Sequence, residues 1–239
     1  MKGSNNLLEI NKIYNTDCMA TLQDLENDSI DITLTDIPYG EVNRDSNGLR
    51  TLNKENADVM TFILDEFLKE VYRVTKGTVI IFCGQHQISE IKDFFQLKQD
   101  KYKGTVRQLI WEKSNSSPMN GQYIYLSGVE NAVWFKKRGG TFNARCKNSV
   151  FKYPCGRSKI HPTEKNHDLL KELILDNSNE GDLLLDPCCG SGSHCLVAKQ
   201  LNRNYIGIEL DENNIYIHRI LNKYKGDNNY RKIKSNFIV

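Results

Sequence analysis

Residues 30–40 read IDITLTDIPYG, and residues 183–193 read LLLDPCCGSGS; these two stretches decide the fold. In each, an apolar run that is typical of a buried strand leads directly into a short loop with an aspartate and a proline. The first loop adds the aromatic ring of Tyr39, and the second adds Gly190 and Gly192. Because open α/β sheets bind ligands at the carboxyl ends of their strands, we expect both loops to line one site.

The composition is compatible with many enzymes. The 239 residues suffice for one large α/β domain, and a formal net charge of +2 does not by itself indicate a nucleic-acid partner. Seven cysteines without a CxxC pair favour reduced thiols over a disulfide framework. The first residues lack the apolar stretch of a signal peptide, and no apolar run reaches the roughly 18 residues of a membrane span. We therefore expect a cytoplasmic protein with no membrane association.

Strand-like and helix-like segments alternate along the chain, which favours a mostly parallel sheet covered by helices. The predicted strands are residues 30–35, 78–83, 106–111, 131–135, 182–186 and 205–209. The predicted helices are residues 62–74, 167–175, 193–201 and 212–224. The polar stretch 41–58 is interpreted as a long loop, either a surface insertion or a lid over the substrate.

The glycine-containing loop indicates a nucleotide-like cofactor. Gly190 and Gly192 allow a tight turn and a close approach of the ligand to the backbone. The next predicted strand ends in Glu209, and a carboxylate at this place typically accepts the hydroxyls of a ribose. A nicotinamide dehydrogenase is the alternative function. However, Cys195 stands where the GxGxxG motif of those enzymes has its third glycine, and Asp186 would repel a pyrophosphate. Asp186 suits a cationic ligand such as S-adenosylmethionine, which carries a sulfonium and no phosphate.

Several segments resemble the amino-methyltransferases of DNA. DPCCGSGS at 186–193 resembles their S-adenosylmethionine-binding motif, usually Asp-Pro-Phe-Cys-Gly-Ser-Gly-Thr, and IGIE at 206–209 resembles their ribose-binding strand. HPTEK at 161–165 resembles their element near the methionine end of the cofactor. NTDC at 15–18 is similar to their Gly-Asp-Cys segment, and WEKSN at 111–115 to a segment beside the target base. The order, with the Asp-Pro-Tyr loop before the cofactor loop, is that of the β group.

This resemblance implies a Rossmann-like methyltransferase fold in the α/β class, with a seven-stranded, mostly parallel sheet and one antiparallel strand. It implies a single domain over residues 1–239, with a small target-recognition insertion at about 136–159. It implies S-adenosylmethionine as cofactor, with Asp17 at its adenine. The predicted cofactor-binding residues are Asp17, Cys18, Asp36, His161, Thr163, Glu164, Asp186, Pro187, Cys188, Cys189, Gly190, Ser191, Gly192, Ser193, Glu209 and Leu210.

The loop at 35–40 supplies the chemistry. The lone pair of an exocyclic amine is delocalised into the ring, and hydrogen-bond acceptors aimed at the amine help it to attack. Asp36 offers one acceptor and the carbonyl of Ile37 a second, while Tyr39 offers a flat face to a base that has left its duplex. Ile37 replaces a proline of the family's Asp-Pro-Pro-Tyr, although Pro38 still biases it away from helical angles. The predicted catalytic residues are Asp36, Ile37, Pro38 and Tyr39.

Two cysteine-based alternatives are weaker. The Pro-Cys dipeptides at 154–155 and 187–188 could suggest the nucleophile of a cytosine ring-carbon methyltransferase, but the motif order of those enzymes is not met. A zinc site of Cys146, Cys155, His161 and His167 matches no familiar ligand spacing, so no metal is predicted.

Basic residues concentrate between 136 and 159, with aromatic residues among them and no acidic residue. This composition is typical of a nucleic-acid contact, and the alternative is a solvated loop. The predicted nucleic-acid contacts are Tyr39, Lys113, Asn115, Arg138, Arg145, Lys147, Lys152 and Arg157.

The sequence thus predicts a site-specific DNA methyltransferase acting on a flipped base in double-stranded DNA. Adenine N6 is the preferred target, because an aspartate at the first position of the catalytic loop leans to adenine in this family. Cytosine N4, an RNA substrate and a catalytically inactive nucleic-acid-binding module remain as alternatives. A cognate restriction endonuclease and a second copy of the chain, in a homodimer, are the further partners considered.

Overall fold

The computed structural model describes residues 8–40, 59–116, 121–155 and 165–211. The described residues form one sheet of eight strands in the order β1-β8-β7-β2-β3-β5-β4-β6. The strands are β1 (Lys12–Asn15), β2 (Ile30–Asp36), β3 (Thr75–Cys83), β4 (Thr105–Lys113), β5 (Val129–Lys136), β6 (Val150–Tyr153), β7 (Leu183–Asp186) and β8 (Asn204–Glu209). All neighbouring strands are parallel except β5, which runs antiparallel to both β3 and β4.

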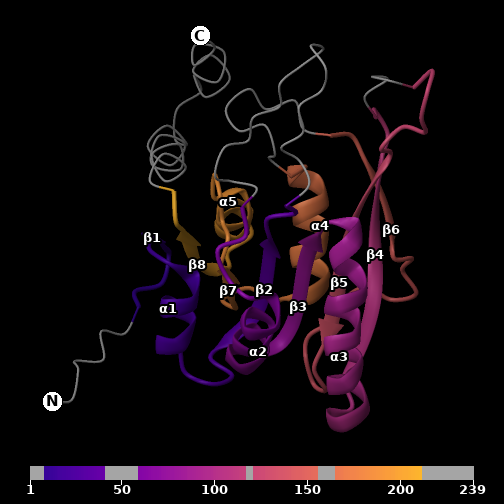
Figure 1. Cartoon of the computed structure of the whole chain (residues 1–239). Helices are drawn as coiled ribbons and strands as arrows, with labels where there is room; N and C mark the ends of the chain where they lie inside the picture. The colour runs from indigo at the N-terminus through magenta and orange to yellow at the C-terminus, as the bar shows by residue number, and fades with distance from the viewer. Residues whose placement is uncertain (1–7, 41–58, 117–120, 156–164, 212–239) are drawn as a thin grey trace, which may run out of the picture.

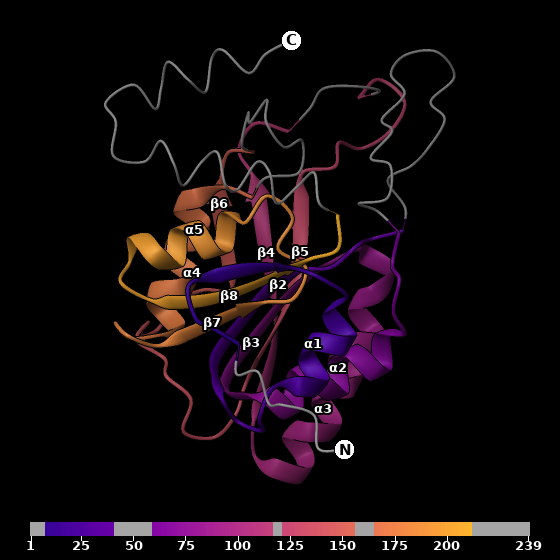
Figure 2. The same ribbon diagram turned by 90° about the vertical axis from the view of Figure 1, so that its left-hand side faces the viewer.

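Helices cover both faces of the sheet (Figures 1 and 2). The helices are α1 (Cys18–Asp24), α2 (Leu64–Val74), α3 (Ile88–Tyr102), α4 (His167–Asn177) and α5 (Ser193–Gln200). The first three lie on one face, and α4 and α5 lie on the other. Residues of β3 alternate between the two cores, with Val79 and Ile81 on the side of α2 and Ile80 and Phe82 on the side of α4. The central strands are therefore apolar on both faces, as expected for a parallel sheet between helices.

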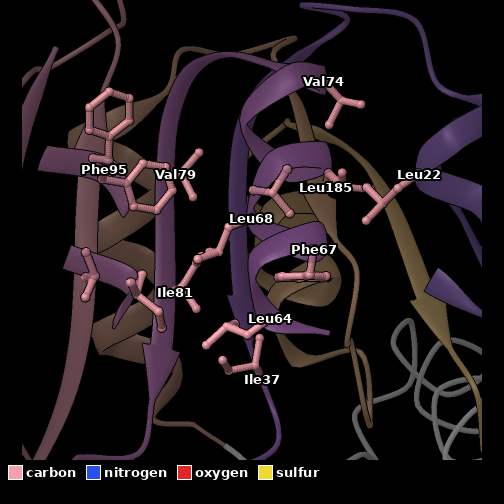
Figure 3. Close-up of a cluster of buried hydrophobic side chains, with 14 of the residues drawn as sticks. Leu22, Ile37, Leu64, Phe67, Leu68, Val74, Val79, Ile81, Phe95 and Leu185 are labelled. Atoms are coloured by element: carbon pink, nitrogen blue, oxygen red, sulfur yellow. The ribbon is translucent and has the colours of Figure 1, made fainter. Parts of the chain in front are cut away.

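Helix α2 packs against the start of the loop that follows β2. Its buried side chains recur at Leu64, Phe67, Leu68 and Val71, the spacing that places apolar groups on one face of a helix. Each such side chain contributes about 1.5–3 kcal/mol when fully buried. Ile37, in the loop after β2, points into the same cluster beside Leu64 (Figure 3) and is 1% exposed. The chain just after Asp36 is thus held in the core.

The strand order places the two predicted loops side by side. In the middle of the sheet, β2 pairs with β7 on one side and with β3 on the other, in parallel. Because β2 and β7 run in the same direction, the loops that follow them leave the same edge, the upper one in Figure 1. This edge is called the carboxyl edge below.

The predicted fold class is confirmed, with several additions. The strand count is eight rather than seven, because β6, which lies inside the predicted insertion, pairs with β4 and extends the sheet. Elements β1, α1 and α3 were also not predicted. The predicted helix at 212–224 and the predicted loop at 41–58 lie outside the described residues. Within the described residues, no helix is long and apolar enough to cross a membrane.

Candidate active site

The backbone of the loop after β2, which is predicted to be catalytic, is fixed by the end of β3. The amide N–H of Ile37 donates to the carbonyl of Phe82 at 3.2 Å. The side-chain amide of Gln87 donates to the carbonyl of Pro38 at 2.9 Å and accepts from the N–H of Gly84 at 2.8 Å. The loop between β2 and α2 therefore begins in a defined position.

The side chains of Asp36 and Tyr39 meet at the carboxyl edge. The hydroxyl of Tyr39 donates to Oδ1 of Asp36 at 2.8 Å, and Nζ of Lys165 lies 2.7 Å from Oδ2. Burial, and after it the charge of Asp36, raises the pKa of Tyr39 well above its usual range, so the phenol stays protonated and donates. Each carboxylate oxygen has two lone pairs, so Asp36 can still accept from a substrate amine.

Lys165 is the buried cation of the site, with 6% of its side chain exposed. Its Nζ also lies 2.9 Å from Oε2 of Glu130 and 3.1 Å from the hydroxyl of Tyr39. The other oxygen of Glu130, Oε1, lies 2.8 Å from Nζ of Lys113. Burial acts to raise the pKa of Glu130, but Lys165 and Lys113 outweigh it and lower this pKa to about 2.

The glycine turn between β7 and α5 is built around Asp186, which is fully buried. Its Oδ1 accepts from the N–H of Cys188 at 3.3 Å, and its Oδ2 lies 2.6 Å from Nδ1 of His194. Gly190 and Gly192 have φ angles of 50° and 78°, a region that favours glycine. Asp186 therefore holds the turn from inside the protein. Its predicted contact with a cationic ligand stays a prediction.

The end of β8 closes the turn from the other side. The N–H of Gly190 donates to Oε2 of Glu209 at 2.7 Å. The side chain of Asn15 donates to the carbonyls of Glu209 and Leu210, each at 3.0 Å. Asp17 caps α1 by accepting from the N–H of Ala20. The segments 15–18 and 209–210, both predicted to bind the cofactor, thus lie next to each other and next to the glycine turn.

The predicted nucleic-acid residues are divided between opposite edges of the sheet. Lys113, Asn115 and Lys152 lie at the carboxyl edge, where Asn115 bonds the backbone of Cys155 and Lys152 pairs with Glu112. Of the other predicted nucleic-acid contacts, Arg138, Arg145 and Lys147 lie elsewhere, and Arg157 lies outside the described residues.

The segment after β5 begins at the opposite edge because β5 runs antiparallel to β3. There the N–H of Lys137 donates to the carbonyl of Gly77, near the start of β3. Further along, Lys147 is held between Glu172 and Asp176 of α4, at 2.6 and 2.5 Å. The structure therefore does not bring Arg138, Arg145 and Lys147 together with the catalytic loop. Arg157 and the cofactor residues His161, Thr163 and Glu164 lie outside the described residues.

Four residues of the site were not predicted: Gln87, Glu130, Lys165 and His194. Lys165 ends the HPTEK segment, so its position was a usable signal. His194 follows the glycine motif directly and could have been found there. Gln87 and Glu130 carry no local signal, because their partners come from distant parts of the chain.

An apolar loop also stands at the carboxyl edge, between β4 and β5. In residues 121–128 the side chains of Tyr123 and Tyr125 are 80% and 101% exposed, and Ile124 is 63% exposed. The loop is anchored where the N–H of Lys113 donates to the carbonyl of Gly128 at 2.8 Å. The loop therefore carries exposed aromatic side chains and is joined at its end to the backbone of Lys113.

Comparison with known families agrees with this geometry. The family model described as DNA methylase matches residues 30–219. The chain belongs to this family. This chain is 30% identical over 220 residues to the Type II methyltransferase M.HpaI of Haemophilus parainfluenzae, and the match covers 82% of this chain and 69% of the relative. It is 29% identical over 242 residues to the Type II methyltransferase M.HinfI of Haemophilus influenzae, covering 85% of this chain and 66% of the relative.

Solved structures show the same fold. The chain superposes on the M1.HpyAVI–SAM complex with a TM-score of 0.66 at 28% identity, over 87% of this chain and 97% of the other. It superposes on the cytosine-N4-specific PvuII DNA methyltransferase with a TM-score of 0.68, over 94% of this chain and 90% of the other. Identity with the latter is 17%, so that likeness concerns the fold alone. The chain spans about two thirds of the length of the two Haemophilus relatives.

Proposed function

We propose that this DNA methylase transfers a methyl group from S-adenosylmethionine to the N6 amine of a flipped adenine in double-stranded DNA. The observation that carries the proposal is the adjacency of the two loops. Ile32 and Thr33 of β2 pair with Leu184 and Leu185 of β7, so the Asp36 loop and the glycine turn open at the same edge. An amine held at the first loop then faces a ligand held at the second.

The residues at the glycine turn fit this cofactor. Gly190 and Gly192 have positive φ angles, which favour glycine, and because glycine has no Cβ a ligand can approach the backbone closely there. Glu209 and Asp17 are carboxylates at the ends of β8 and β1, where they suit hydroxyl and amino groups and would repel a phosphate. The bound cofactor would supply an electrophilic methyl group on a sulfonium.

The catalytic loop would orient and activate the amine. Asp36 and the carbonyl of Ile37 accept the two N–H bonds of the amine, which frees the nitrogen lone pair to attack the methyl carbon in line. Acceptors aimed at the nitrogen stabilise the positive charge that develops on it. The ring of Tyr39 provides a stacking face for the base. The nitrogen afterwards loses one proton to solvent, and no covalent bond forms between protein and DNA.

DNA would approach the carboxyl edge. Lys113, Asn115 and Lys152 lie there with the exposed loop 121–128, and a flipped base must enter from this side to reach Asp36. The Haemophilus relatives are Type II methyltransferases, which supports a cognate restriction endonuclease as a partner.

Nucleoside analysis of host DNA tests the proposal. The chain is expressed in a host without endogenous adenine or cytosine amino-methylation, and its DNA is digested to nucleosides and identified by mass. N6-methyladenine at a short recurrent sequence is expected. N4-methylcytosine would favour the alternative target, and unmodified DNA together with no S-adenosylmethionine binding by the purified protein would favour an inactive nucleic-acid-binding module.

A further inference from the structure

Three oxygens, from Asp36, Glu130 and Tyr39, surround the ammonium group of Lys165. Its Nζ lies 2.7 Å from Asp36 Oδ2, 2.9 Å from Glu130 Oε2 and 3.1 Å from the hydroxyl of Tyr39. It donates a hydrogen bond to the hydroxyl of Tyr39 and forms ion pairs with the two carboxylates, although Glu130 Oε2 accepts no well-directed hydrogen bond from the described residues. The side chain is also buried, so it has one position and cannot turn toward another ligand without leaving Asp36.

The cluster balances charges from three strands of the sheet, β2, β4 and β5, and from Lys165, just before α4. Asp36 and Glu130 carry two negative charges, and Lys165 and Lys113 carry two positive charges. Asp36 ends β2 and Glu130 lies on β5, so only the folded sheet brings them to the same lysine. Asp36, Glu130 and Lys113 each keep between 15% and 22% of their side chains exposed, which is little enough for strong coupling.

Balance matters for the chemistry of an amine. Positive charge develops on the attacking nitrogen next to Asp36, and a nearby lysine ammonium opposes it. If Asp36 were the only anionic partner of Lys165, the ammonium would interact more strongly with this carboxylate. Asp36 would then be a weaker hydrogen-bond acceptor for the substrate amine. Glu130 shares the ammonium, so Asp36 is held in place while keeping acceptor capacity for the substrate.

We propose that Lys165 and Glu130 are positioning residues for methyl transfer: Lys165 fixes Asp36 and Tyr39, and Glu130 offsets the charge of Lys165. This inference rests on the proposed function and deepens it. Neither residue is required to touch the base or the cofactor, so their effect should fall on the rate of transfer and not on cofactor affinity.

Single-turnover methylation with labelled cofactor tests the two residues. Lys165→Met should slow transfer on the order of 10²-fold, the size of losing one preorganised donor from a charged site. Glu130→Gln keeps the shape of the side chain and should slow transfer about tenfold, the effect of about 1.4 kcal/mol. Affinity for S-adenosylmethionine should stay within about twofold for both variants. Lys76→Met is the matched control, because it removes a lysine paired at 2.8 Å with Asp31, at the other end of β2.

A double-mutant cycle separates positioning from mere stability. If Lys165 acts through Asp36, then Asp36→Ala with Lys165→Met should be no slower than Asp36→Ala alone. Multiplying losses would overturn the inference, as would wild-type rates in both single variants. Thermal unfolding checks that each variant is folded, and Glu130→Gln carries the test should Lys165→Met not fold. A wild-type protein that methylates no DNA would instead refute the proposed function itself.

Discussion

At the scale of single residues, Asp36 works within a ring of contacts. Its two oxygens accept from Tyr39 and Lys165, and Tyr39 in turn contacts Lys165. From the sequence alone Tyr39 is a stacking face, and its hydroxyl looks dispensable. In the structure that hydroxyl also donates to one oxygen of Asp36, the carboxylate that is proposed to activate the amine.

Tyr39→Phe tests the hydroxyl separately from the ring. The stacking face is kept, but a hydrogen bond to a charged group is lost, which is worth about 1.5 kcal/mol. We expect transfer to slow roughly tenfold with unchanged affinity for DNA, because a 1.4 kcal/mol change is a factor of ten. Rates of Tyr39→Phe and Tyr39→Ala are compared under single-turnover conditions. A wild-type rate for Tyr39→Phe beside a slow Tyr39→Ala would show that stacking, not the hydroxyl, carries the effect.

The lowered pKa of Glu130 predicts a pH dependence of stability. A carboxyl with a pKa of about 2 in the folded protein and an ordinary value in the unfolded chain stabilises the fold above about pH 4.5, and this contribution is lost as the pH falls toward 2. From pH 5 to pH 3 the loss from this group is about 2 kcal/mol. Urea unfolding should therefore show a smaller decline over this range for Glu130→Gln than for the wild type. Parallel declines would contradict the ion pairs with Lys165 and Lys113.

At the scale of elements, the glycine turn is held by what surrounds it. Asp186 fastens its base, and Glu209 at the end of β8 accepts from Gly190 at its tip. The turn therefore joins β7, β8 and α5, and its backbone angles are available only to residues that tolerate positive φ.

A pair of glycine variants separates strain from cofactor binding. Gly190 and Gly181 both have positive φ, at 50° and 85°, but Gly181 precedes β7 at the opposite edge and an added Cβ there would meet nothing within 4 Å. Each change to alanine should cost about 1–2 kcal/mol of folding free energy. Calorimetry should show loss of S-adenosylmethionine binding for Gly190→Ala alone. Normal affinity in Gly190→Ala would place the cofactor elsewhere.

The position of strand β6 leads us to expect that Lys152 contacts DNA. It carries Lys152 to the carboxyl edge, where this side chain is 66% exposed. Lys152→Gln should lower the slope of log affinity against log salt concentration by about 0.9, the value for one phosphate contact on duplex DNA. Lys69→Gln, which removes a lysine from an exposed pair with Asp65 on α2, is the control. An unchanged slope for Lys152→Gln would mean that DNA does not contact β6.

At the scale of the whole molecule, local patterns predict the centre of the fold well and its margins poorly. The strands β2, β3 and β7 are near-continuous apolar runs, so their places were evident. Strand β1 has four residues and none is buried, and α3 buries only Ile91 and Phe95, so neither shows a clear period.

The basic segment after β5 shows where sequence neighbourhood misleads. Its residues are contiguous in the sequence, but the antiparallel strand β5 ends at the edge opposite Asp36. Strand β6 then runs back to the carboxyl edge. The Lys165–Glu130 contact likewise joins distant parts of the chain, because Glu130 lies on β5 and Lys165 just before α4. Sequence motifs predicted the two loops, whereas the charged residues that contact Asp36 could be identified only from the structure.

The central claim is that the loop at Asp36 activates a base amine beside the cofactor. Purified protein is mixed with methyl-labelled S-adenosylmethionine and unmethylated genomic DNA, and the labelled nucleoside is identified for the wild type and for Asp36→Ala. We expect label in N6-methyladenine for the wild type, and on the order of 10²–10³-fold less for Asp36→Ala at unchanged cofactor affinity. Near-normal labelling of adenine by Asp36→Ala, or label in another base with the wild type, would contradict the claim.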